Sequence, residues 1–167
     1  MTESDITAVN DNYICCFTGH RSIAVENIDK MSALVDSILD MLISQGVTQF
    51  RTGGAVGFDT LAALKIIEKK KNNPHIQLHL ILPCKNQSES WNELCQKIYG
   101  YTLEAADSIT YISDTYVSGC MLKRNRSLVD GSQFCVAYCK SEDGGSAYTL
   151  NYAKKQGLRT INVATML

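Results

Sequence analysis

Thr52-Gly53-Gly54-Ala55-Val56-Gly57-Phe58-Asp59-Thr60 is a glycine-rich stretch between a strand-like run at 47–51 and an apolar, helix-forming run at 61–68. Glycines at a strand-to-helix junction let the backbone turn tightly and approach a ligand, because a Cβ atom would block both. The first amides of the following helix have no intrahelical partners and lie at the positive end of the helix dipole. The stretch therefore predicts a turn that can bind a phosphate, although a turn that binds nothing has the same pattern.

The composition indicates one globular domain. The chain has 167 residues, of which 45% are hydrophobic and 20% are charged, and this length fits one domain with a sizeable core. Residues 1–12 are polar and acidic, so we expect a loosely ordered lead-in there, followed by one domain at 13–167. This lead-in lacks the charged-then-apolar order of a signal peptide. We therefore expect a cytoplasmic protein.

Charge, hydropathy and cysteine spacing argue against several classes of partner. The net charge is −1 without a polybasic run, which disfavours tight nucleic-acid binding but leaves room for a local basic patch. No apolar run approaches the roughly 20 residues of a membrane span, so we expect no membrane partner. The seven cysteines are odd in number and show no C-x-x-C pair or Cys/His cluster at zinc spacing. We expect reduced thiols and no metal site.

Strand and helix signals alternate along the whole chain. Continuous apolar runs at 13–17 and 133–138 are typical of strands that are buried on both faces. Further strand signals lie at 47–51, 77–82, 108–112 and 159–163, and helical patterns lie at 31–43, 61–68, 91–98, 121–129 and 148–155. This alternation predicts an α/β fold: a single Rossmann-like domain in which a mostly parallel sheet has helices on both faces.

The polar and glycine-rich loops follow the predicted strands. In parallel sheets of this kind, ligands bind outside the carboxyl ends of the strands, where the strand order reverses. The loops at these ends are Thr18-Gly19-His20-Arg21, Gly53-Gly54, the segment 85–88 and Gly144-Gly145-Ser146. We therefore expect these loops to share one rim and to form a binding crevice.

Three charged or polar side chains on this rim have both a functional and a structural interpretation. Arg21 directly follows a buried strand, where an arginine is well placed to bind phosphate or carboxylate. His20 beside it is either a ligand contact or a surface loop residue. Asp59 lies in the first turn of a helix, where the dipole stabilises an acid with or without a ligand, and a ribose hydroxyl could donate to it.

A dense cationic cluster, Lys123-Arg124-Asn125-Arg126, lies at the start of a predicted helix. Cations at that end oppose the helix dipole, so they need another reason to be present. We interpret the cluster as an anion-facing edge, with a solvated charge run as the alternative. Trp91 and Tyr99 fit packing better than base stacking.

Taken in order, these motifs resemble YpsA-like proteins of the SLOG superfamily, Rossmann-like nucleotide-ligand proteins that include DprA and the LOG cytokinin-activating enzymes. The resemblance covers about 13–163. It rests on five motifs: Thr18-Gly19-His20-Arg21, Gly53-Gly54-Ala55-x-Gly57-x-Asp59, Leu82-Pro83, Arg124-Asn125-Arg126 and Gly144-Gly145-Ser146-Ala147-Tyr148-Thr149. It implies a SLOG-type fold that binds a nucleotide-derived ligand such as ADP-ribose or a dinucleotide, with no required cofactor. The expected ligand-binding residues are Gly19, His20, Arg21, Gly53, Gly54, Gly57, Asp59, Arg124, Gly144, Gly145, Ser146 and Thr149.

The resemblance also bears on catalysis. LOG-type hydrolases carry a catalytic glutamate where this chain has Asn151, and an amide cannot transfer the required proton. We therefore expect a binding protein rather than an enzyme, and we assign no catalytic residue. A hydrolase that uses Asp59 or Glu89 as its acid/base remains an alternative. So does a DprA-like binder of single-stranded nucleic acid, because DprA shares the glycine and R-N-R motifs. A homodimer, as in related SLOG proteins, is also compatible with the sequence.

Overall fold

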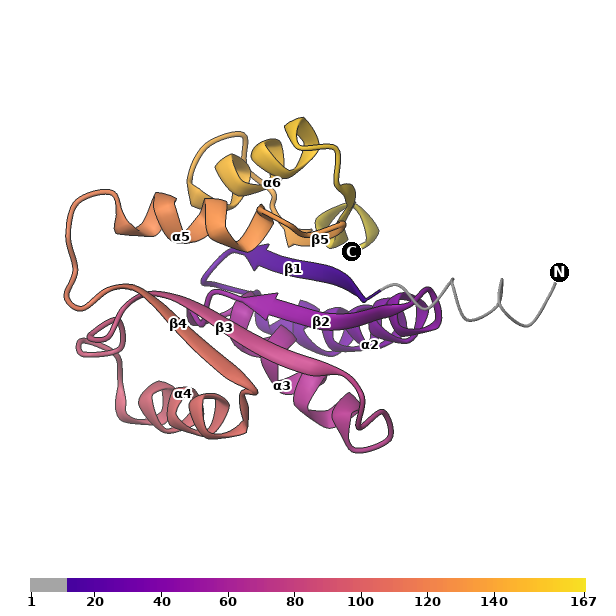
Figure 1. Cartoon of the computed structure of the whole chain (residues 1–167), viewed down its shortest axis with the longest axis horizontal. Helices are drawn as coiled ribbons and strands as arrows, with labels where there is room; N and C mark the ends of the chain where they lie inside the picture. The colour runs from indigo at the N-terminus through magenta and orange to yellow at the C-terminus, as the bar shows by residue number, and fades with distance from the viewer. Residues whose placement is uncertain (1–11) are drawn as a thin grey trace, which may run out of the picture.

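Six strands form one parallel sheet in the computed structural model, which describes residues 12–167 (Figure 1). Their order across the sheet is β4-β3-β2-β1-β5-β6, and every pair of neighbours is parallel. The strands are β1 (Tyr13–Gly19), β2 (Val47–Thr52), β3 (Gln77–Cys84), β4 (Ser108–Ser113), β5 (Phe134–Tyr138) and β6 (Arg159–Asn162). The predicted lead-in falls outside the described residues, apart from Asn12.

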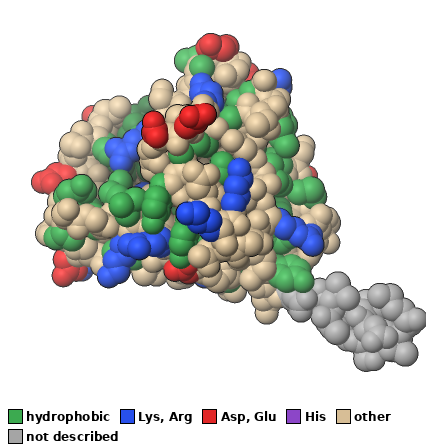
Figure 2. Space-filling view, turned by 90° about the horizontal axis from the view of Figure 1, so that it is seen from above, with side chains coloured by type: hydrophobic (Ala, Val, Ile, Leu, Met, Phe, Trp, Pro, Cys, Tyr) green, Lys and Arg blue, Asp and Glu red, His purple; other side chains and the backbone are tan. Residues whose placement is uncertain are grey.

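Helices cover both faces of the sheet, so the predicted α/β class is confirmed. One face is covered by α2 (Ile28–Ser44), α3 (Phe58–Lys70) and α4 (Glu93–Ala105), and the other by α5 (Cys120–Val129) and α6 (Gly145–Lys155) (Figure 1). Two short 3-10 helices, η1 (Val25–Asn27) and η2 (Val163–Met166), complete the described elements. Viewed from the side of α5 and α6, basic side chains are dispersed among hydrophobic ones (Figure 2).

The two continuous apolar runs of the sequence become the central strands β1 and β5. Cys15, Cys16 and Phe17 of β1 have no exposed surface, and all five residues of β5 are buried. On one face, the Phe17 ring packs against Phe50 and Phe58, with centroids 6.2 and 6.3 Å apart. These strands are apolar throughout because helices cover them on both sides.

The order of the strands reverses between β1 and β5. The chain builds β1 to β4 outward in one direction, then returns through α5 to place β5 on the other side of β1. At the carboxyl edge, Gly19 of β1 pairs in register with Tyr138 of β5. The next α-helix along the chain is α2 on one face after β1 and α6 on the other face after β5 (Figure 1). The two loops therefore diverge, which opens a crevice at the switch point.

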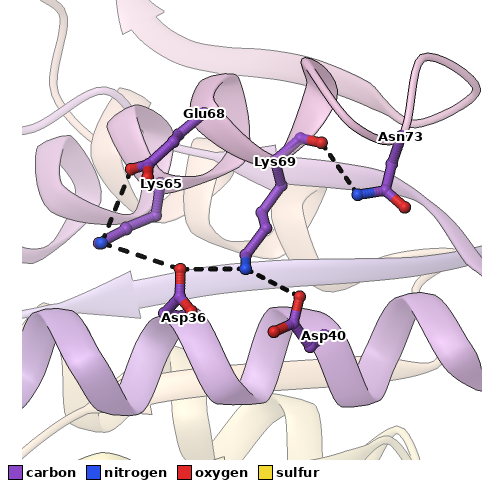
Figure 3. A network of polar contacts seen from close by, with 6 residues as sticks. All are labelled: Asp36, Asp40, Lys65, Glu68, Lys69 and Asn73. Carbon is purple, nitrogen blue, oxygen red and sulfur yellow. Dashed lines mark hydrogen bonds and ion pairs between the residues drawn. The ribbon is translucent and has the colours of Figure 1, made fainter.

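A network of ion pairs joins α2 to α3 (Figure 3). Lys69 Nζ lies 2.8 Å from Asp40 Oδ1 and 3.0 Å from Asp36 Oδ1, and Lys65 Nζ lies 3.8 Å from Asp36. The hydrogen bond to Asp40, followed by the contacts to Asp36, raises the pKa of Lys69 despite its partial burial. Because both carboxylates are more than a third exposed, the network adds little to stability and chiefly orients the two helices.

Gly57 locks the start of α3 against the loop that follows β1. Its φ of 86° is in the left-handed region, and a Cβ atom there would lie 2.4 Å from the backbone oxygen of Arg21. The neighbouring carbonyl of His20 accepts a hydrogen bond from the Phe58 amide at 3.1 Å, so this backbone cannot shift freely. Glycine is therefore required at this position both for its conformation and for space.

We predict that Gly57→Ala lowers the free energy of unfolding by about 3 kcal/mol, since it adds backbone strain and a steric clash. Gly100→Ala is the matched control, because Gly100 lies inside α4 and its added Cβ would meet no atom within 4 Å. There the same change should stabilise the protein by about 0.5–1 kcal/mol through helix propensity. Urea unfolding of both variants measures the difference. Equal effects of the two substitutions would contradict this account of Gly57.

Candidate functional site

A cavity of about 360 Å³ opens at the carboxyl edge of the sheet, between the loops that follow β1 and β5. Its volume is at the lower end of the range of about 300–1,000 Å³ that is typical of small-molecule sites. The walls come from four segments that are far apart in the sequence. They are Thr18, Gly19, His20 and Arg21; Ala55 and Asp59; Met121, Leu122, Arg124, Asn125 and Leu128; and Asp143, Gly144, Gly145 and Ser146.

Arg124 is a buried cation that ties α5 to the glycine-rich stretch. Its side chain is only 5% exposed, Nη1 donates to the Gly53 carbonyl at 2.5 Å, and Nε donates to Asn125 Oδ1 at 2.9 Å. A Cβ atom on Gly53 would lie 2.5 Å from Arg124 Nη1 and 3.0 Å from Asp59 Oδ2. Gly53 therefore leaves space for the guanidinium of Arg124.

Asp59 is a buried carboxylate beside this guanidinium. It is 5% exposed, and its Oδ2 accepts a hydrogen bond from the Ala55 amide at 3.2 Å. Burial raises the pKa of Asp59 from 3.8 to about 6, against the opposing influence of Arg124, the Ala55 amide and Arg21. Its other oxygen, Oδ1, is buried without a hydrogen-bond partner among residues 12–167. An orphaned acceptor in a cavity wall suits a hydroxyl donor from a bound molecule.

His20 joins the loops after β1 and β5. Its Nε2 accepts a hydrogen bond from the Lys140 amide at 2.8 Å, and its ring packs edge-on against Tyr138 with centroids 5.3 Å apart. Burial, with a smaller contribution from the charge of Lys140, lowers the pKa of His20. Both the accepted hydrogen bond and the lowered pKa favour the neutral ring with its proton on Nδ1. His20 thus fixes the geometry of the cavity as an uncharged group.

Arg21 is the exposed cation of the cavity. Within residues 12–167 its guanidinium forms no salt bridge, although it lies near enough to Asp59 and Arg124 to influence their pKa values. Since no described carboxylate neutralises it, Arg21 is available for an anion that enters the cavity.

The N-terminus of α6 forms the opposite wall. The helix begins after Gly144, and no side chain in the described part of the chain caps it. By contrast, α4 is capped by Asn92, whose Oδ1 accepts from the Cys95 amide at 2.8 Å. Gly145 and Ser146, the first residues of α6, line the cavity. Their amides lie at the positive end of the helix dipole and can donate to an anion.

The structure brings most of the predicted ligand-binding residues together around one cavity. Those that line it are Gly19, His20, Arg21, Asp59, Arg124, Gly144, Gly145 and Ser146. The others lie behind the lining. A Cβ atom on Gly54 would clash with Leu82, Gly57 packs on the loop after β1, and the buried Thr149 hydroxyl donates to the Gly145 carbonyl within α6. Gly53, as described above, contacts Arg124.

Two residues that the sequence raised for catalysis lie outside the cavity, and two residues that line the cavity were not predicted. Glu89 is exposed outside the cavity lining, and Asn151 is exposed on α6. Met121 and Leu128 line the cavity, yet sequence reasoning did not identify them. Their spacing could have identified them. Met121 is three residues before Arg124 and Leu128 is four after it, and residues at these spacings share one face of a helix.

Residues 12–167 contain neither a metal-ligating cluster nor a disulfide. No group of three or more His, Cys, Asp or Glu side chains in residues 12–167 could hold a metal ion. All seven cysteines are free. None of the helices in that part is long and apolar enough to cross a membrane.

The raised pKa of Asp59 predicts a specific pH dependence. The folded state binds the Asp59 proton more tightly than the unfolded chain, so this contribution to stability is fully present below about pH 3.8 and is lost as the pH rises through about 6. Asp59→Asn keeps an acceptor for Ala55 but does not titrate. We expect it to gain about 2 kcal/mol of unfolding free energy relative to the wild type between about pH 4 and pH 7.

Urea unfolding at several pH values measures this gain. Asp143→Asn, which removes the same charge from an exposed position in the same cavity, is the matched control for the loss of charge itself. If the difference in unfolding free energy between the wild type and Asp59→Asn stays constant across this pH range, Asp59 is not held in an unfavourable charged state.

Comparison with solved structures identifies the fold. DNA processing protein A (DprA) from Helicobacter pylori, in a structure that concerns its single-stranded DNA binding mode, superposes with a TM-score of 0.65 at 16% identity. That match covers 92% of this chain and 66% of the other. DprA from Streptococcus pneumoniae gives a TM-score of 0.61 at 12% identity, over 91% of this chain and 50% of that one. At such identities the likeness establishes the fold alone, which is the predicted Rossmann-like fold.

Relatives found by sequence share more identical residues with this chain than the solved structures do. A UPF0398 protein of Halalkalibacterium halodurans is 36% identical over 118 residues, which cover 69% of this chain and 62% of the relative. The uncharacterised SPbeta prophage-derived protein YoqJ of Bacillus subtilis is 32% identical over 139 residues, covering 76% of this chain and 80% of YoqJ. The chain thus spans less than two thirds of the Halalkalibacterium relative. The model of the YspA SLOG family (YpsA) matches residues 15–166. The chain therefore belongs to the YpsA family of SLOG proteins, as its motifs predicted.

Proposed function

We propose that this protein binds a nucleotide-derived ligand, such as ADP-ribose or a dinucleotide, with a phosphate group in the cavity at the switch point. The observation that carries the proposal is that two features converge on one cavity: Arg21, a cation without an ion pair within residues 12–167, and the start of α6, which no side chain of those residues caps. Membership of the SLOG family supports a ligand of this class.

The phosphate end of the ligand lies between Arg21 and the first turn of α6. The amides of Gly145 and Ser146 donate to the phosphate oxygens, and the Arg21 guanidinium neutralises the charge from the opposite wall. Arg124 adds positive potential from behind the lining while its own hydrogen bonds hold it in place. Since the α6 amides lie at a fixed helix terminus, they need little reorganisation on binding.

The sugar end of the ligand lies toward Asp59. The unpartnered Oδ1 of this carboxylate accepts a hydrogen bond from a ribose hydroxyl. With a pKa of about 6, Asp59 is mostly ionised at neutral pH and accepts rather than donates. The same pKa allows a proton transfer, so the hydrolase alternative would use Asp59. In that case Asp59→Asn would abolish turnover of a nucleotide while binding persisted.

We predict that Arg21→Ala weakens binding of ADP-ribose or another nucleotide ligand by about tenfold to a hundredfold, because it removes a charged hydrogen-bond donor. Arg159→Ala, at the amino end of β6, is the matched control: it removes the same charge from an exposed position outside the cavity and should leave affinity unchanged. Thermal-shift screening with NAD, ADP-ribose, AMP, ATP, cyclic nucleotides and oligonucleotides, followed by calorimetry, measures these affinities.

Each alternative gives a different result in the same screen. Stabilisation only by oligonucleotides, with an affinity that falls steeply with salt, would support a DprA-like role in single-stranded DNA binding instead. Turnover of a bound nucleotide would establish the enzyme. If no compound stabilises the protein, the proposal is wrong.

A further inference from the structure

A second, smaller cavity of about 190 Å³ adjoins the first. Arg21 and Met121 line both cavities, so the two meet at these side chains. The rest of the smaller lining comes from the end of β3, the loop after it and the loop before α5. These residues are Pro83, Cys84, Gln87, Ser90, Trp91 and Tyr116.

Two aromatic side chains from different loops border this smaller cavity. The Trp91 ring packs edge-to-face on Tyr99, with centroids 5.0 Å apart and an interplanar angle of 80°, so its orientation is fixed. Tyr99 is a packing residue as expected, but Trp91 both packs and lines the cavity. Tyr116 is 64% exposed, and its amide donates to Asn86 Oδ1 at 3.2 Å, which anchors its loop. Aromatic walls of this kind suit a planar ring.

Gln87 supplies a polar edge to the same cavity. Its Nε2 donates to the Tyr99 hydroxyl at 3.2 Å and to the Gly54 carbonyl at 3.5 Å. Its carbonyl oxygen, Oε1, is buried without a hydrogen-bond partner among residues 12–167. A buried amide oxygen without a donor among the described residues needs a partner, and the exocyclic amino groups of nucleobases are donors that a glutamine oxygen can accept from.

We propose that the smaller cavity is a subsite for the nucleobase of the ligand whose phosphate lies in the main cavity. This inference rests on the function proposed above and narrows it. Arg21, which lines both cavities, stands where the base-bearing sugar joins the phosphate. The ligand class is therefore nucleoside phosphates and their derivatives, and sugar phosphates that lack a base bind less tightly.

Trp91 makes the subsite directly observable, because it is the only tryptophan of the chain. Titration with ADP, GDP, CDP and UDP should quench its fluorescence saturably with at least one of them. Ribose 5-phosphate and pyrophosphate should bind without quenching. The preferred nucleoside diphosphate should also bind about tenfold or more tightly than either base-free compound, because stacking of a base is worth about that much.

Tyr116→Ala should weaken binding of the preferred nucleoside diphosphate about tenfold and leave the affinity for ribose 5-phosphate unchanged. A side chain that served only to stabilise the fold would change both affinities together. Tyr101→Ala is the matched control, because Tyr101 is 50% exposed on α4 and lines neither cavity. That control should leave both affinities unchanged.

The outcomes separate this inference from the function on which it rests. If nucleoside diphosphates and ribose 5-phosphate bind equally well, depend on Arg21 and leave Trp91 fluorescence unchanged, the subsite is overturned and phosphate binding stands. If neither these compounds nor ADP-ribose and NAD bind, both the subsite and the proposed function are wrong. Quenching by oligonucleotides alone would overturn the small-ligand subsite and favour a nucleic-acid interface.

Discussion

The buried guanidinium of Arg124 is the constraint on which the site depends. A cation with so little exposed surface has lost its hydration, and only a full set of local partners offsets that cost. The partners come from two places: Asn125 beside it on α5, and the Gly53 carbonyl at the end of β2. Meeting this requirement fixes α5 against the glycine-rich stretch and holds Asp59 at the wall of the cavity. Two separate sequence motifs, the glycine-rich stretch and the cationic cluster, thereby become one unit.

Much of the fold could be predicted because its signals are local. Continuous apolar runs, helical periodicity and glycine breaks are properties of a few neighbouring residues, and they identified β1, β5 and the helices between the strands. The position of the polar loops followed as well, since parallel strands bring their carboxyl ends to one edge. The boundaries were less certain. For example, α2 begins at Ile28, before the first core residue of its apolar stripe, Met31.

The assignment of individual residues within the site could not be predicted in the same way. Gly53 suggested close approach of a ligand, but the space that it leaves is occupied by a side chain 71 residues away. The cationic cluster on α5 contains residues in two environments. Each step along a helix turns the side chain by about 100°, so residues two positions apart point to nearly opposite sides. Arg124 is buried, whereas Arg126 is exposed. Both distinctions depend on how α5 packs, which is a property of the tertiary structure.

The pairing of β1 with β5 has a consequence for assembly. Ile14 and Gln133, which are hydrogen-bonded beside this pair, are 119 residues apart, so the central seam of the sheet closes a very long loop. Contacts of this range form late, because the chain must first lose the entropy of that loop. During synthesis, the first four strands of the sheet can form before β5 has left the ribosome. The ligand crevice, whose walls lie on both sides of the seam, is therefore among the last features of the protein to take shape.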